Sequence, residues 1–106
     1  MPRIKIERSS GNVFRDLGFG SAEAANLKIR ADLMIEIDRI IKRRKLTQGA
    51  AAKLLGVTQP RISDLVRGKI HLFSIDTLVD MLTRAGARVR VNVHGSRHKA
   101  KHSQAA

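Results

Sequence analysis

Two short segments on either side of Gly56 place the tightest limit on how this chain can fold. Thr47 and Thr58 belong to the residue types that favour the position just before the first turn of a helix. Each is followed by about two helical turns that end at a glycine, Gly56 or Gly68. Because glycine readily takes the left-handed conformation that ends a helix, the pattern predicts two short helices joined by a tight turn.

The side chains of this segment are sorted as a helix-turn-helix requires. Small alanines, Ala51 and Ala52, stand in the first helix where the second helix has to cross it. Apolar residues that can lock the second helix to the core, and polar residues left for its outer face, follow at helical spacing: Val57, Ile62 and Leu65, then Gln59, Arg61, Ser63 and Asp64. The segment 47–68 is therefore predicted to place its second helix in the major groove of DNA.

Charge supports a polyanionic partner. The chain has 21 Lys and Arg against 9 Asp and Glu, a net charge of +12. Between Arg39 and Ile75 nine residues are basic and Asp64 is the one acid, so the two signs are separated along the chain. Binding of RNA or nucleoid DNA by charge alone is the alternative, but the polar face of the second helix favours sequence-specific binding to duplex DNA.

The rest of the chain predicts an all-α domain with one C-terminal strand. A long helix begins with Ser21 as its N-cap and runs to about Arg44, and a later helix begins after Ser74 and ends at Gly86. Residues 87–93 alternate strictly between valine and polar side chains, as a β-strand does. We predict an N-terminal arm over 1–20, the helix-turn-helix domain over 21–94, and a basic disordered tail over 95–106.

A lone strand needs a partner for its backbone groups. We predict antiparallel pairing with the same strand of a second copy, which gives a homodimer through Arg88–Val93 that reads a palindromic operator. Pairing with the N-terminal segment from Ile4 to Ile6 is the lower-ranked alternative.

The segment resembles a known family. The residues that carry the likeness are Thr47-Gln48, Ala51-Ala52, Leu55-Gly56-Val57, Gln59, Ile62-Ser63, Leu65 and Arg67-Gly68-Lys69. They resemble the lambda-repressor-like, or Xre, helix-turn-helix. The resemblance implies that Gln48 contacts the DNA backbone and braces Gln59, which reads adenine, while Arg67 and Lys69 contact phosphate. Pro60 stands where lambda repressor reads a base with serine.

The likeness extends to an antitoxin subgroup of the same family. The runs Phe14-Arg15-Asp16-Leu17-Gly18-Phe19, Glu23-Ala24-Ala25, Lys28-Ile29-Arg30-Ala31-Asp32-Leu33-Met34 and Gln59-Pro60-Arg61-Ile62-Ser63-Asp64-Leu65 resemble HigA-like antitoxins. This likeness implies a repressor that also binds a ribonuclease toxin of the HigB/RelE type. A stand-alone Xre-type regulator is the alternative.

The sequence also suggests where a toxin would bind. Exposed apolar residues at the N-terminus and acids on the first long helix would form a docking surface: Ile4, Ile6, Val13, Phe14 and Phe19, and Glu23, Asp32, Glu36 and Asp38. An acidic surface would complement a basic, RNA-cleaving toxin. The plainer reading is that the apolar residues extend the core and the acids are ordinary surface.

Four further residues of the reading helix are candidate DNA contacts. Thr58 is expected to cap the helix and could also touch a thymine methyl or a phosphate, and Ser63 faces the groove. Arg61 reaches guanine or phosphate. Asp64 either accepts from cytosine or, as we favour, pairs with Arg61 or Arg67. No cysteine, paired acids or phosphate loop is present, so we expect a protein that is no enzyme and needs no metal or cofactor. We also expect the protein to be cytoplasmic and associated with the nucleoid.

Overall fold

The computed structural model describes residues 3–7 and 17–94, so the predicted tail 95–106 and the apolar pair Val13 and Phe14 lie outside the described residues. The elements, in chain order, are strand β1 (Arg3–Glu7), helices α2 (Ser21–Arg43), α3 (Gln48–Leu55) and α4 (Gln59–Val66), the 3-10 turn η1 (Ile70–Leu72), helix α5 (Ile75–Arg84) and strand β2 (Arg88–Asn92). This largely helical architecture with a C-terminal strand confirms the predicted fold class.

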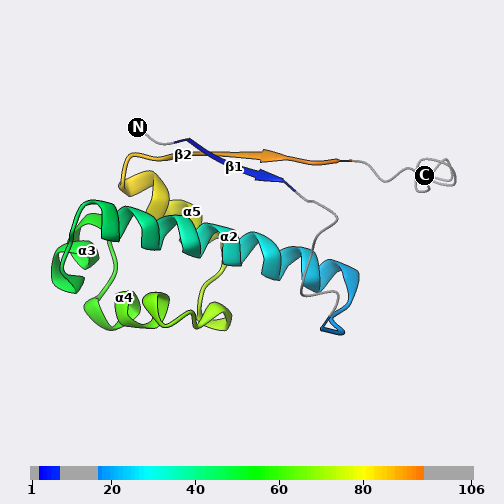
Figure 1. Ribbon diagram of the computed structural model, residues 1–106, viewed down its shortest axis with the longest axis horizontal. Coiled ribbons are helices and arrows are strands. Elements are labelled where there is room, and N and C mark those ends of the chain that lie inside the picture. The colour runs from blue at the N-terminus through cyan, green and yellow to red at the C-terminus, as the bar shows by residue number, and fades with distance from the viewer. Residues whose placement is uncertain (1–2, 8–16, 95–106) are drawn as a thin grey trace, which may run out of the picture.

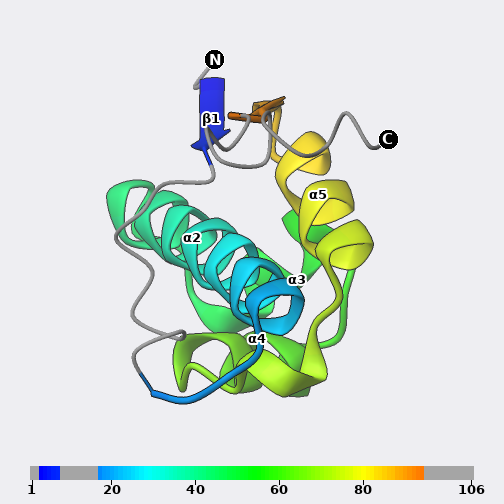
Figure 2. The same ribbon diagram turned by 90° about the vertical axis from the view of Figure 1, so that its right-hand side faces the viewer.

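Helix α2 is the scaffold against which the other elements pack. Figures 1 and 2 show the two strands on one side of α2 and α4 on the opposite side. The core of the described residues is almost entirely aliphatic, and Phe73 is its one aromatic side chain. Its fully buried large side chains come from several elements and are Leu33, Ile37, Ile40, Leu55, Ile62, Phe73, Leu78, Met81 and Leu82.

The ends of α2 differ from expectation in one respect. Gly20, and not Ser21, is the N-cap, and no side chain makes the capping hydrogen bond there. At the other end the chain leaves the helix through Lys45, whose φ of 54° lies in the left-handed region. The amide of Leu46 donates to the carbonyl of Ile41 at 3.0 Å, which closes the helix end.

Strand β2 has a strand partner within the chain. Strand β1 pairs with β2 in parallel, with Ile4 opposite Val89 and Ile6 opposite Val91. The lower-ranked alternative is therefore the observed one. Five residues of β1 are too few to give a firm strand signal, and the long chain between β1 and β2 folds so that the two strands meet.

Among the described residues, the helices are all too short or too polar to cross a membrane.

Candidate nucleic-acid interface

Helix α3 begins as its sequence predicts. The hydroxyl oxygen of Thr47 accepts a hydrogen bond from the amide of Ala50 at 3.1 Å, which caps the helix. Ala51, Ala52 and Leu55 are buried against the rest of the domain. The two alanines matter because their small side chains allow α3 and α4 to approach closely.

The turn between α3 and α4 depends on Gly56. Its φ of 72° lies in the left-handed region, where a side chain is strained. A Cβ at this position would also lie 2.7 Å from Cδ of Arg84, which packs over the turn from α5. The dihedral angle therefore favours glycine here, whereas the flexible side chain of Arg84 can move away from an added methyl group.

Helix α4 is capped differently from the prediction. Thr58 occupies the N-cap position, but its side chain makes no capping hydrogen bond. Its backbone carbonyl accepts the first hydrogen bonds of the helix, from the amides of Arg61 and Ile62 at 3.1 and 3.2 Å, as the carbonyl of an N-cap residue does. Pro60 fits in the first turn because the amide that proline lacks would have no partner within the helix there.

The far end of α4 closes as expected. Gly68 has a φ of 75°, and the amide of Lys69 donates to the carbonyl of Asp64 at 3.1 Å. Ile62 and Leu65 are buried, so α4 is fixed by one face and presents the other to solvent. That outer face carries Gln59, which is exposed in the first turn, and Arg67, which is exposed at the end.

The two glutamines lie at the same end of the motif. Gln48 and Gln59 are both exposed, and a Cβ built on Gly49 would lie 3.8 Å from Oε1 of Gln59. The side chain of Gln59 therefore reaches back to the start of α3. Within residues 3–7 and 17–94 no hydrogen bond joins the two glutamines, so the predicted bracing stays a prediction for the DNA complex.

Arg61 does not lie on the outer face. Its guanidinium stacks on the ring of Phe73, 4.3 Å from the centroid, and the side chain is half-buried. Sequence reasoning missed this contact because Arg61 and Phe73 are joined by no local pattern.

Asp64 forms an ion pair, but with neither of the partners that we favoured. Its Oδ1 lies 3.8 Å from Nζ of Lys69. The predicted partners were Arg61 and Arg67. The left-handed turn at Gly68 reverses the chain after α4 and brings Lys69 back alongside Asp64.

Three arginines close to the motif are held by the protein itself. Arg30 donates to the carbonyls of Ile70 and Phe73 at 3.3 and 3.4 Å. Arg44 donates to the carbonyl of Ala85, and Arg84 to the carboxylate of Asp80. The exposed cations near the motif that make no such contact in the described part of the chain include Arg43, Lys45, Lys53 and Arg67.

Three of the four acids that we expected to form an acidic surface are paired with basic residues of α2, and the fourth, Glu23, is exposed in the first turn. Asp32 pairs with Lys28 at 2.7 Å, Glu36 with Arg39 at 2.7 Å, and Asp38 with Lys42 at 2.8 Å. Each pair is three or four residues apart on the same helix, where facing side chains meet. The charges of these three acids are therefore locally balanced, which weakens the docking argument drawn from them.

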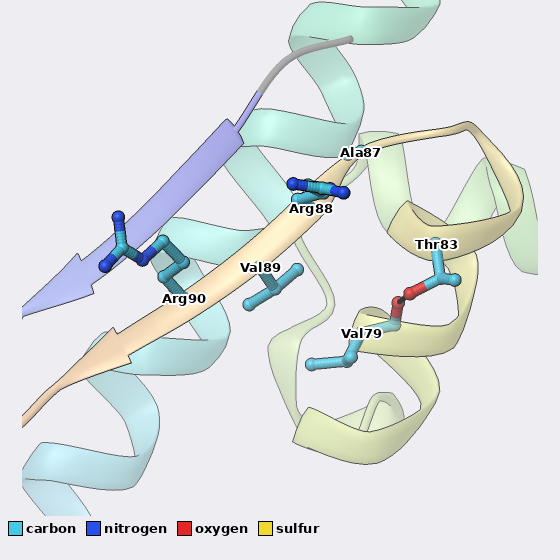
Figure 3. A pocket seen from close by; sticks show the side chains of 6 residues that line it. All are labelled: Val79, Thr83, Ala87, Arg88, Val89 and Arg90. Atoms are coloured by element: carbon cyan, nitrogen blue, oxygen red, sulfur yellow. Dashed lines mark hydrogen bonds between the residues drawn. The ribbon is translucent and has the colours of Figure 1, made fainter.

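A groove of about 660 Å³ runs between β2 and α5. Figure 3 shows β1 on the side of β2 away from α5, and Val89 pointing from β2 toward α5. The hydroxyl of Thr83 donates to the carbonyl of Val79 on the α5 wall at 2.9 Å. The edge of β2 that does not pair with β1 thus faces an open groove with partly apolar walls.

Comparison with known proteins agrees with this geometry. A family model described as a helix-turn-helix domain matches residues 13–94. A solved structure named for the XRE family of transcriptional regulators superposes with a TM-score of 0.65 at 28% identity, covering 71% of this chain and 84% of that one. No curated protein matches the chain.

Fold and site together define a DNA-binding transcriptional regulator with an XRE-type helix-turn-helix, a non-enzymatic class of protein. The chain belongs to the helix-turn-helix domain family.

Proposed function

We propose that the protein is a sequence-specific repressor that binds its operator through the outer face of α4, with Gln59 as the principal base reader. The observation that carries the proposal is the position of Gln59, exposed in the first turn of a helix whose opposite face is buried through Ile62 and Leu65. A glutamine amide there can pair with N6 and N7 of adenine at once. Ser63 lies one turn further along α4.

Phosphate contacts would hold α4 in the groove. Gln48 at the start of α3 and Thr58 at the start of α4 are exposed, and the hydroxyl of Thr58 is not used for capping. Arg67 and Lys69 follow α4 and would contact the backbone beyond it. Because these contacts carry no sequence information, losing one should weaken binding to all duplexes about equally.

The test is selection of bound sequences from a random duplex pool, followed by titration of the selected operator. The Gln59→Ala variant should lose preference at one base pair, at a cost of about 1–3 kcal/mol in binding free energy. Arg67→Ala is the matched control, because loss of a phosphate contact should lower affinity and leave the selected sequence unchanged. An identical selected sequence for Gln59→Ala would show that another residue reads the base. Equal affinity for operator and random duplex at every salt concentration would favour charge-only binding.

The repressor is proposed to act as a homodimer through Arg88–Val93. Val91 and Val93 are 59% and 69% exposed, and the edge of β2 beside α5 is free of backbone partners among the described residues. A second copy that pairs there would cover this surface and set two recognition helices about 34 Å apart on a palindrome.

Sedimentation tests the dimer. Val91→Asp should give a monomer, because it places a charge in the proposed interface. Ile35→Asp makes the same change at a 50% exposed position on α2 and should leave the dimer intact. A dimeric Val91→Asp protein would exclude this interface.

The antitoxin role, with a HigB/RelE-type ribonuclease as partner, is the finer part of the proposal. It rests on the subgroup resemblance and on Leu17, which is 69% exposed just before α2, with Phe19 also exposed. Co-expression with the product of the neighbouring gene tests it. A stable complex that is weakened by Leu17→Asp, a change that leaves β1 intact, would support it. Full repression by the protein alone, beside a gene for no such ribonuclease, would favour the stand-alone regulator.

A further inference from the structure

Helix α4 has few apolar anchors of its own. It spans eight residues, of which Ile62 and Leu65 are buried. A helix this short is not stable alone, so its orientation depends on tertiary contacts. The angle at which α4 meets the groove is therefore set by whatever fixes it to the scaffold.

Phe73 provides one such fixed point. Phe73 is 1% exposed and directly follows η1, at the junction with α5. The guanidinium of Arg61, from the first turn of α4, covers the ring of Phe73 at 4.3 Å. A cation stacked on a shielded aromatic face is held more firmly than one in water.

The same segment is bound from the other side by α2. One nitrogen of Arg30 donates to the carbonyls of Ile70 and Phe73, at 3.3 and 3.4 Å. Nε of Arg30 donates to Oδ1 of Asn26 at 2.7 Å, which fixes the arginine on its own helix. The η1 segment is thus joined to α2 through Arg30 and to α4 through Arg61.

We infer that Arg61 is a positioning residue for DNA recognition, which holds α4 to the scaffold through Phe73, and is not itself a base or phosphate contact. This inference rests on the proposed function and departs from the sequence-based expectation for Arg61. Two consequences follow. The effect of Arg61 on operator affinity has to depend on Phe73, and its loss has to leave the number of neutralised phosphates unchanged.

The salt dependence of binding separates positioning from contact. The logarithm of affinity falls with the logarithm of salt concentration with a slope of about 0.9 for each neutralised phosphate. Arg61→Met, which keeps a long apolar side chain, should lower operator affinity about tenfold with an unchanged slope. Arg67→Gln, at the exposed C-cap of the same helix, is the matched control and should lower the slope by about 0.9. A reduced slope for Arg61→Met, or a changed selected sequence, would overturn the inference.

A double-mutant cycle tests the coupling to Phe73. Phe73→Leu should lower operator affinity, and adding Arg61→Met should lower it little further, because both changes break the same contact. Arg61→Lys, which keeps the cation, should recover part of the affinity. Additive losses in the double variant would show that Arg61 acts without Phe73.

A measurement on the free protein keeps the inference separate from the proposed function. Arg61→Met should speed amide hydrogen exchange in α4, whereas Arg67→Gln should not. This result is expected even if the wild-type protein shows no operator preference, which would refute the proposed function alone. Unchanged exchange in α4 of Arg61→Met would contradict the positioning role whatever the DNA titrations give. This measurement does not depend on the Phe73→Leu variant.

Discussion

Asp64 and Lys69 form an ion pair across the end of the recognition helix, with 3.8 Å between Oδ1 and Nζ. The pair places a carboxylate beside a cation that is predicted to contact phosphate. Both side chains are partly exposed, so the attraction between them is weakened by solvent. The acid therefore restrains Lys69 and adds a local repulsion toward the DNA backbone.

Asp64→Asn should raise affinity for every duplex sequence about two- to fivefold, the range expected for loss of a partly exposed ion pair. The measurement is titration of operator and random duplex at low salt. Glu23→Gln removes the same charge from the distant start of α2 and serves as the control. If Asp64→Asn instead changed the selected base sequence, Asp64 would be a base reader that accepts from cytosine.

Gly56→Ala should lower the free energy of unfolding by about 1–2 kcal/mol, because a side chain is strained at a φ of 72°. Urea denaturation measures the change. Arg84 is long and flexible enough to move away from the new methyl group, so the cost should remain nearly the same in an Arg84→Ala background. Gly49→Ala, in the helix beside the turn, should stabilise by about 0.5 kcal/mol. A large recovery in the Arg84→Ala background would show that steric overlap, and not the dihedral angle, dominates.

Lys45→Gly should raise the free energy of unfolding by about 0.5–1 kcal/mol. The gain comes from relieving a left-handed lysine, and the greater freedom of glycine in the unfolded chain offsets part of it. The denaturation midpoint should rise without a change in slope. Arg43→Gly, which lies within the helix, should instead destabilise the protein. A neutral or destabilising Lys45→Gly would mean that the lysine side chain makes a stabilising contribution larger than the strain.

The two threonine caps should differ in their effect on stability. Thr47→Ala removes a capping hydrogen bond and should cost about 1 kcal/mol. Thr58→Ala removes none and should cost less than about 0.5 kcal/mol. Thermal unfolding of both variants provides the comparison, and equal losses would contradict the assigned capping geometry.

The helices and most of their ends were readable from the sequence because their signals are local, although the N-cap of α2 and the capping of α4 differ from expectation. The threonine before α3, the glycine after it and the spacing of Ile62 and Leu65 all act within a few residues. These features suffice for the helix-turn-helix and for the assignment of Gln59 to its outer face. Helix geometry alone brings a side chain next to those three or four residues away, so such contacts can be predicted from the sequence.

Only the tertiary structure decided the contacts between segments distant in sequence. Arg61 meets Phe73, and β1 meets β2, because α2 brings these segments together. Asp64 and Lys69 are only five residues apart, but which basic neighbour Asp64 meets depends on how the chain reverses at Gly68. A sequence specifies charge and periodicity residue by residue. The partner of an arginine or of a strand edge is instead set by the packing of the whole domain, because several residues of similar chemistry could serve and the folded geometry selects one of them.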